Sequence, residues 1–319
     1  MVTRIAFIGS GGIAEWQHFD TLEEIDSAKV VGICDIDETA ANEAAERFDA
    51  KVFTDHETLL DELTLDAVFI CLPPFAHENQ EIMAAERGIN LFVEKPIALT
   101  NEKARTIREA IEANDVVSQV GYNWRYAPAV DRARELLEGR TIEYIDGRFW
   151  GGVPGGEDHW WRHQARSGGQ VVEQATHNFD MVRFLAGDVK RLYAAGADRV
   201  SDLVDFSDVT STTMTHESGA VSHVSTSCIA EDGDSRLEVI ADGATLTISQ
   251  NEIHGSIDGD EIHEEFEANP YVTEVKSFLE AVETNDDSKI RAPYSDATKT
   301  LALTLAVTES IESGEPITL

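Results

Sequence analysis

The chain has 319 residues, of which 42% are hydrophobic, and it carries 60 acidic against 25 basic side chains, a formal net charge of −35. This length indicates two domains, and the hydrophobic fraction excludes a disordered chain. A strongly negative surface repels phosphate groups, so the charge argues against nucleic acid and anionic membranes as partners.

The N-terminal part of the chain alternates short apolar runs with helix-like segments. The runs that predict strands are Arg4–Gly9, Val30–Asp35, Ala67–Leu72, Leu91–Glu94 and Val116–Gly121. The segments that predict helices are Ile13–Ile25, Glu38–Phe48, His77–Arg87 and Asn101–Ala113. Strands that are apolar on both faces and alternate with helices indicate a parallel sheet covered on both sides. We therefore predict a doubly wound α/β domain over residues 1–122.

After Tyr122 the pattern changes to consecutive strands. The predicted strands include Tyr144–Trp150, Ser207–His216, Val221–Ile229, Leu237–Ala241 and Thr245–Ser249. The predicted helices are Val171–Leu185, Val272–Glu283 and Ser295–Glu312. Several strands in a row, joined by short Gly and Asp turns, indicate an antiparallel sheet. The sequence therefore predicts an α+β domain over residues 123–319.

A glycine-rich loop follows the first predicted strand and opens the first predicted helix. Its residues, which fit the G-x-G-x-x-G/A pattern of dinucleotide sites, are Gly9, Ser10, Gly11, Gly12, Ile13 and Ala14. Glycines let the backbone approach a pyrophosphate, and the amino end of the helix meets its charge. The second strand ends in Asp35, which can accept hydrogen bonds from both ribose hydroxyls. Asp35 and Asp37 repel a 2′-phosphate, so we predict NAD rather than NADP.

The fourth predicted strand ends at the sequence Val93-Glu94-Lys95-Pro96. Ligands of doubly wound sheets bind beyond the carboxyl ends of the strands, so we expect Lys95 to point into the cofactor crevice. Proline after Lys95 restricts the backbone and removes a donor, which makes a rigid turn. We predict Glu94 and Lys95 as cofactor contacts and Lys95 also as a substrate contact.

A second candidate group is formed by Glu173, His177 and Asp180, whose i, i+4, i+7 spacing places them on one face of a continuous helix. Removal of a hydride from an alcohol carbon requires the hydroxyl proton to leave, and histidine is suited to accept it near neutral pH. Lys95 can stabilise the developing alkoxide, and a carboxylate can orient the imidazole. We predict Lys95, His177 and Glu173 as the catalytic residues. A histidine satisfied inside the core is the alternative for His177.

In their order and spacing, these motifs resemble the glucose–fructose oxidoreductase/inositol dehydrogenase (Gfo/Idh/MocA) family over essentially the whole chain. The residues that carry the resemblance are the Gly9–Ala14 loop, Cys71-Leu72-Pro73-Pro74 with His77, Glu94-Lys95-Pro96, Gly121 to Tyr126, Gly168-Gly169 with Glu173 and His177 to Asp180, and Glu309-Ser310 with Ser313-Gly314. The resemblance implies a Rossmann domain followed by a domain whose large open antiparallel sheet serves substrate binding and oligomer contacts. It also implies NAD(P)-dependent oxidation or reduction of sugars, cyclitols and related alcohols.

The resemblance also implies roles for single residues. Pro73, Pro74 and His77 would line the nicotinamide, and Lys95 would be the family's lysine. The family commonly has Asp where this chain has Glu173, and this departure leaves the role of the carboxylate and the choice of substrate open.

Several further residues are candidates for substrate contact. Asn123, Arg125 and Tyr126 follow the predicted domain junction and are expected to reach the crevice. Around Trp160, Trp161 and Arg162 we expect a wall over a sugar ring, because aromatic faces pack against C–H groups and Arg donates to hydroxyls. Ordinary packing of at least one of these tryptophans is the alternative.

His159 and His163 have the i, i+4 spacing of a metal-binding pair. No Cys joins them, and hydride transfer to NAD needs no metal, so no metal is predicted.

The predicted function is that of an NAD-dependent dehydrogenase or reductase acting on a secondary alcohol or carbonyl of a sugar, cyclitol or sugar derivative. One alternative is a glycosidase that keeps NAD bound and oxidises its sugar transiently. The other is a non-catalytic NAD or sugar sensor, against which Lys95 and His177 argue. A broad C-terminal sheet favours a homodimer or homotetramer, because single chains rarely leave such a face bare.

The composition also predicts the working environment. Three cysteines, Cys34, Cys71 and Cys228, lie in apolar runs and are too few for a disulfide framework, which is typical of core residues in a reducing compartment. No apolar run approaches the ~20 residues of a membrane span, so we expect a cytoplasmic protein.

With a net charge of −35, the acidic side chains repel one another in dilute buffer, and molar salt screens this repulsion. We therefore expect a salt-adapted (halophilic) protein, with an ordinary acidic enzyme as the alternative.

Overall fold

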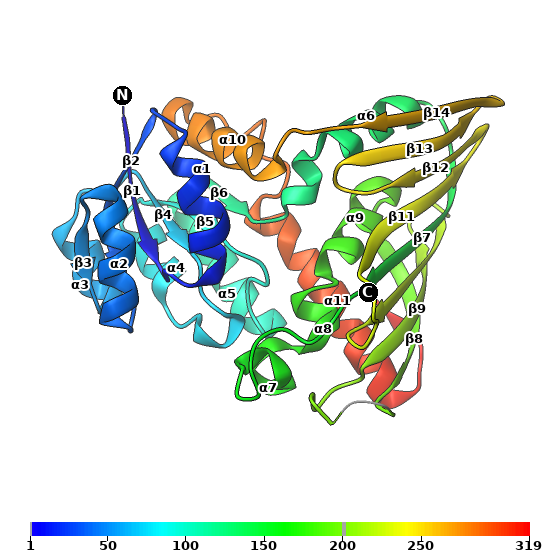
Figure 1. Cartoon of the computed structure of the whole chain (residues 1–319), viewed down its shortest axis with the longest axis horizontal. Coiled ribbons are helices and arrows are strands. Elements are labelled where there is room, and N and C mark those ends of the chain that lie inside the picture. Colours follow the sequence, from blue (N-terminus) through cyan, green and yellow to red (C-terminus); the bar gives the residue numbers. More distant parts are fainter. Residues whose placement is uncertain (1, 200–201) are drawn as a thin grey trace. The chain divides into compact units, whose positions relative to one another are not determined.

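A computed structural model describes residues 2–199 and 202–319 of the chain (Figure 1). The chain divides into two compact units: unit 1 contains Met1–Asn123 and Tyr271–Ala297, and unit 2 contains Trp124–Pro270 and Thr298–Leu319. Contrary to the contiguous division expected from the sequence, the segment Tyr271–Ala297 returns to unit 1. It does so because Val275, Phe278 and Leu279 belong to the apolar core of that unit.

Unit 1 is built on a six-stranded parallel sheet with the strand order β3-β2-β1-β4-β5-β6. Its strands are β1 (Thr3–Ile8), β2 (Ala28–Cys34), β3 (Lys51–Phe53), β4 (Ala67–Ile70), β5 (Asn90–Val93) and β6 (Ser118–Val120). The five predicted strands are present, and β3 is an additional edge strand. This order is that of a dinucleotide-binding domain, in which the ligand crevice opens at the carboxyl ends of β1 and β4.

Helices cover the sheet of unit 1. They are α1 (Asp20–Glu23), α2 (Glu38–Phe48), α3 (His56–Glu62), α4 (Gln80–Glu86), α5 (Asn101–Asn114) and α10 (Pro270–Thr284). A π-helical turn over Ala14–Phe19 precedes α1, where the sequence predicts a continuous α-helix. In the core, the rings of Phe69 and Phe92 stack with centroids 4.8 Å apart, and Phe278 of α10 meets both edge-on at 5.6 Å.

Unit 2 is built on a nine-stranded sheet with the order β14-β13-β12-β11-β7-β10-β9-β8-β15. Its strands are β7 (Ile142–Trp150), β8 (Val189–Ala197), β9 (Val209–His216), β10 (Val221–Ser227), β11 (Asp234–Ala241), β12 (Ala244–Ile248), β13 (Glu252–Ile257), β14 (Asp260–Glu265) and β15 (Ile317–Thr318). Neighbouring strands are antiparallel except for β7 and β10, which pair in parallel. The prediction of a mainly antiparallel sheet is confirmed.

Helices pack on one face of this nine-stranded sheet (Figure 1). Those of the second half of the chain are α6 (Pro128–Leu137), α7 (Gln164–Ser167), α8 (Gly169–Glu173), α9 (Thr176–Ala186) and α11 (Tyr294–Ser313). Val130 of α6, Phe179 of α9 and Val307 of α11 share one apolar core with the inward side chains of the strands. The strands alternate between buried and exposed side chains, as along Val209–His216, so the opposite face of the sheet is open.

The three cysteines are buried and free, as the sequence predicts. Burial and neighbouring carboxylates raise the pKa of Cys34 to about 12 and that of Cys228 to about 11, so both thiols stay protonated at neutral pH. Within residues 2–199 and 202–319, no helix combines the length and the apolarity that crossing a membrane requires.

Candidate active site

The glycine loop of unit 1 lies at the carboxyl end of β1, and its backbone is shaped for close approach. Gly9 has a φ of +93°, and a Cβ at this position would collide with the carbonyl oxygen of Cys71 at the end of β4. A Cβ at Gly11 would meet no atom within 4 Å, so this side of the loop is open. The loop therefore presents a bare backbone to a ligand, as the pyrophosphate of a dinucleotide requires.

Asp35 lies beside the loop, immediately after β2. Its Oδ2 accepts hydrogen bonds from the backbone N–H of Ser10 (2.8 Å) and from the Ser10 hydroxyl (3.1 Å). Its Oδ1 accepts from the backbone N–H of Asp37 (3.0 Å). A carboxylate has about four acceptor sites, so Asp35 keeps capacity for ribose hydroxyls. Asp37 accepts from Thr39 N–H (2.9 Å) and caps α2, which fixes the start of this helix at the residue that the sequence predicts.

Glu94 and Lys95 follow β5 and differ in their burial. Glu94 is 3% exposed, and its carboxylate accepts from the Nε2 of His18 (2.8 Å) and from the backbone N–H of Lys95 (3.1 Å). A Cβ at Gly121 would lie 2.6 Å from Glu94 Oε2, which explains the glycine there. Glu94, predicted as a cofactor contact, is thus engaged inside the unit as a support for the turn that carries the half-buried Lys95.

The turn after β4 contains Pro73, Pro74 and His77. Pro74 opens a 3₁₀ turn, and His77 is buried behind it. The Nδ1 of His77 pairs with the carboxylate of Glu81, and its Nε2 lies 3.3 Å from the carbonyl oxygen of Leu72. Burial acts to raise the pKa of Glu81, but electrostatic attraction to His77 and the hydrogen bond with it outweigh burial and hold this pKa below its usual value.

In unit 2 the predicted helix over Val171–Leu185 is interrupted, which corrects the expectation of one continuous helical face. The carbonyl of Gln170 accepts from the N–H of Gln174 (3.0 Å) and also from that of Ala175 (2.9 Å), so one residue is added to the turn. Glu173 therefore ends α8, and His177 lies in the first turn of α9. Both side chains are partly exposed.

Glu173 has a partner that the sequence does not reveal. Its Oε2 accepts a hydrogen bond from the indole Nε1 of Trp161 (2.6 Å). Trp161 is 1% exposed and meets the ring of Phe206 edge-on at 5.2 Å. Trp161 is therefore packed inside its unit and holds Glu173, so at least one of the two tryptophans makes ordinary packing contacts.

Arg125, predicted to contact substrate, is instead buried in an ion pair. Its guanidinium donates to both carboxylate oxygens of Asp180, at 2.7 and 2.6 Å, and lies over the ring of Phe184 at 4.9 Å. Asp180 Oδ1 also accepts from the hydroxyl of Thr300 (2.8 Å). A bidentate pair of this kind fixes α9 and with it the backbone of His177.

The remaining residues predicted to contact substrate differ in their burial and in their hydrogen bonds. Arg162 is 8% exposed and donates to the carbonyls of Gly155 (3.2 Å) and Leu203 (3.4 Å), so it braces its own loop. Trp160 is partly exposed, and Asn123 and Tyr126 are buried. The Nδ2 of Asn123 has no hydrogen-bond partner among the described residues and is thus a donor that a ligand can use.

No metal cluster is visible in the part of the chain that the structure describes. His159 Nδ1 accepts from the Trp161 N–H (3.3 Å), whereas His163 Nδ1 pairs with Asp205 (3.2 Å). The two rings thus have different partners.

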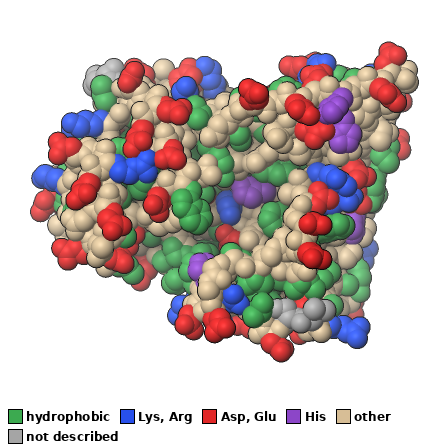
Figure 2. All heavy atoms as spheres, in the orientation of Figure 1, with side chains coloured by type: hydrophobic (Ala, Val, Ile, Leu, Met, Phe, Trp, Pro, Cys, Tyr) green, Lys and Arg blue, Asp and Glu red, His purple; other side chains and the backbone are tan. Residues whose placement is uncertain are grey.

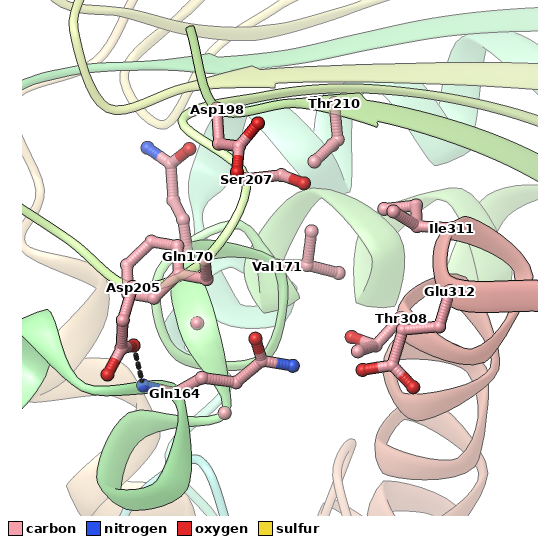
Figure 3. A pocket seen from close by; sticks show the side chains of 13 residues that line it. Gln164, Gln170, Val171, Asp198, Asp205, Ser207, Thr210, Thr308, Ile311 and Glu312 are labelled. Atoms are coloured by element: carbon pink, nitrogen blue, oxygen red, sulfur yellow. Dashed lines mark hydrogen bonds between the residues drawn. The ribbon is translucent and has the colours of Figure 1, made fainter. Parts of the chain in front are cut away.

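A pocket of about 210 Å³ lies in unit 2 between α8 and the last turns of α11 (Figure 3). Polar side chains line much of it, among them Gln164, Gln170, Ser207, Thr308 and Glu312. None of the predicted catalytic residues is among its lining residues, so the pocket is not assigned to the reaction.

Comparisons with known proteins agree with the order of the two domains along the chain. Residues 3–122 match the model of the Gfo/Idh/MocA oxidoreductase family, NAD-binding Rossmann fold, and residues 130–247 match the model of its C-terminal domain. The chain is 28% identical to a scyllo-inositol 2-dehydrogenase (NAD(+)) of Bacillus subtilis over 99% of this chain and 96% of that protein. It is 26% identical to the uncharacterized oxidoreductase YrbE of the same organism, over 98% and 95%.

The fold is also that of solved structures. A levoglucosan dehydrogenase in complex with NADH and levoglucosan superimposes with a TM-score of 0.90 at 19% identity, over 100% of this chain and 99% of that one. With both of its domains matched in order, the chain belongs to the Gfo/Idh/MocA family of oxidoreductases, and its unit 1 is the NAD-binding Rossmann domain.

Proposed function

We propose that this protein is an NAD-dependent oxidoreductase that transfers a hydride between the nicotinamide and a secondary alcohol or carbonyl of a sugar, cyclitol or sugar derivative. The observation that carries the proposal is the Glu94-supported turn that presents Lys95 at the carboxyl edge of an NAD-binding sheet. Relatives that are named as inositol and levoglucosan dehydrogenases support the substrate class.

In the proposed reaction, bound NAD supplies the hydride acceptor. His177 accepts the proton of the reacting hydroxyl, and the Lys95 ammonium donates a hydrogen bond to the same oxygen and stabilises its negative charge. Glu173, held by the indole of Trp161, is a positioning residue for the His177 side of the site. We propose Asn123, Tyr126 and Trp160 as the substrate contacts and assign Arg125 and Arg162 to the scaffold.

For the cofactor, the proposal favours NAD over NADP. Asp35 is fixed beside the loop by three hydrogen bonds, and Asp37 adds a second negative charge where a 2′-phosphate would lie. Gly9, Gly11, Gly12 and Ile13 would hold the pyrophosphate, and Pro73 and Pro74 would flank the nicotinamide.

The test is NADH fluorescence in molar KCl against a panel of aldoses, inositols and sugar acids. NADH formed in proportion to a polyol or sugar supports the proposal. A chain that cleaves a glycoside without net NADH is the NAD-dependent glycosidase, and one that binds NAD but turns over nothing in the panel is a sensor.

For the assembly, we propose a homodimer or homotetramer formed through the open face of the nine-stranded sheet. Five exposed large apolar side chains lie on this face: Trp150, Tyr193, Val209, Val221 and Ile240. Polar groups between them are paired, as Arg148 is with Glu238 (2.9 Å). Light scattering should show an oligomer that Ile240→Asp dissociates and that Val2→Asp, a change at an exposed valine of unit 1, leaves intact.

The environment is proposed to be a cytoplasm of high salt. Acidic side chains are spread over the face shown in Figure 2 rather than gathered at one site, which favours adaptation to salt over an acidic binding patch. Unfolding midpoints should rise from dilute buffer to molar KCl, and equal midpoints would contradict the proposal.

A further inference from the structure

Unit 1 leaves few large apolar side chains in solvent, and most of them lie at one edge. Within its described residues, the exposed ones are Val2, Trp16, Ile36 and Phe75. Trp16 follows β1, Ile36 follows β2 and Phe75 follows β4, so these three lie beyond the carboxyl ends of parallel strands. Exposed apolar groups that gather at one place indicate a binding surface. Ile36 lies between Asp35 and Asp37, and Phe75 follows Pro74, so both adjoin residues predicted to act in cofactor binding. Trp16 has no predicted role that would explain its exposure.

The indole of Trp16 lies over the glycine loop itself. It is 71% exposed, and a Cβ at Gly12 would lie 3.2 Å from its Cη2 and Cζ3 atoms. Glycine at position 12 therefore makes room for the indole, while the neighbouring position Gly11 stays open. Trp16 stands on the π-helical turn Ala14–Phe19, and such turns occur frequently at functional sites.

The charges around the glycine loop suggest how the indole could contribute to binding of a diphosphate. The segment Gly9–Asp20 contains no Lys or Arg, and Glu15, Asp35 and Asp37 lie on it or near it. A diphosphate bound here would be met by backbone N–H groups, because this segment supplies no Lys or Arg side chain. An apolar wall beside these N–H groups excludes water, and hydrogen bonds to a charged ligand are stronger in the lower local dielectric.

We propose that Trp16 is a cofactor-binding residue whose indole covers the diphosphate and the adjoining ribose of the bound dinucleotide. The proposal rests on the proposed function of unit 1 as an NAD site. It assigns Trp16 to the diphosphate end of the cofactor and gives it no part in the hydride transfer.

The test is isothermal titration of the full-length chain with NAD and with ADP-ribose, which has the diphosphate but no nicotinamide. Trp16→Ala should raise both dissociation constants by about tenfold, the size of effect expected for one lost aromatic contact of about 1.4 kcal/mol. Trp16→Phe should restore most of the affinity. The control is Val2→Ala, which shortens an exposed apolar side chain at the amino end of β1, the end opposite the glycine loop, and should leave both constants within a factor of two.

Two results would overturn the inference, and they differ from failure of the proposed function. Unchanged binding of both ligands by Trp16→Ala would show that the indole contributes nothing. A loss for NAD with none for ADP-ribose would place the indole at the nicotinamide end. A wild-type chain that binds neither ligand would remove the NAD site, and the role of Trp16 with it. Circular dichroism should show the same fold in both variants, since the exposed indole makes little contact with the core.

Discussion

The buried pair of His18 and Glu94 offers a quantitative test of how Lys95 is held. The perturbation is a double-mutant cycle with Glu94→Gln, His18→Leu and the combined variant. Glu94 is 3% exposed and His18 is fully buried, with its ring edge-on to those of Phe69 and Phe92 at 5.5 and 5.1 Å. His18 Nδ1 has no hydrogen-bond partner among the described residues, so its bond to Glu94 is the polar contact that the cycle probes.

The magnitudes follow from burial. Removal of one partner of a buried hydrogen-bonded pair costs about 1–3 kcal/mol of unfolding free energy, because the other polar group stays buried without this bond. His18→Leu should fall in this range. Glu94→Gln keeps an acceptor for the Lys95 N–H and should cost about 2 kcal/mol. In the double variant leucine fits among the phenyl rings, so the cost should be smaller than the sum by about 1–3 kcal/mol.

The assay is urea unfolding at neutral pH in molar KCl, with kcat as a second readout. Glu94→Gln should lower kcat as well, because the backbone of Lys95 loses the charge of its acceptor. Costs that add to within about 0.5 kcal/mol would show that the two side chains do not interact energetically, and the account of the turn would be refuted.

Three further predictions concern the reaction and its pH range. Lys95→Ala and His177→Ala should each lower kcat by about 10²–10⁴ with unchanged unfolding curves, and full activity in either would contradict the mechanism. Asp35→Ser should raise KM for NAD and lower KM for NADP, and initial rates with both cofactors decide this. Because the folded-state pKa of Glu81 lies below its unfolded value, its contribution to stability is present above about pH 4.5 and is lost as pH falls further. Acid titration of Glu81→Gln should therefore show a weaker loss of stability below that pH than the wild-type chain shows.

Local patterns were enough for much of unit 1. The helix Glu38–Phe48 is found with the predicted bounds because Asp37 caps it and its alanines recur with helical spacing. The pairing of His77 with Glu81 was not predicted, because His77 has an extended backbone and lies before α4, which begins at Gln80. The interruption of the predicted helix after Glu173 could not be predicted from the sequence, because Glu173, His177 and Asp180 have the spacing of one continuous helix.

Pairs of side chains that are far apart in the sequence limit how much of the candidate site can be predicted from it. Arg125 and Asp180 are 55 residues apart, and His18 and Glu94 are 76 apart. In each pair a residue that the sequence offers as a ligand contact is occupied by a partner that only the fold brings near. Residue type and position therefore predict a candidate site, whereas the division between contact and scaffold needed the structure.

The most direct test of the central claim is a crystal structure of the protein with NADH and a polyol that the fluorescence panel identifies. The proposal predicts that the Lys95 ammonium and the His177 imidazole both lie within hydrogen-bond distance, about 3.2 Å or less, of the same substrate oxygen. A closed ternary complex in which that oxygen is contacted by neither side chain would contradict it.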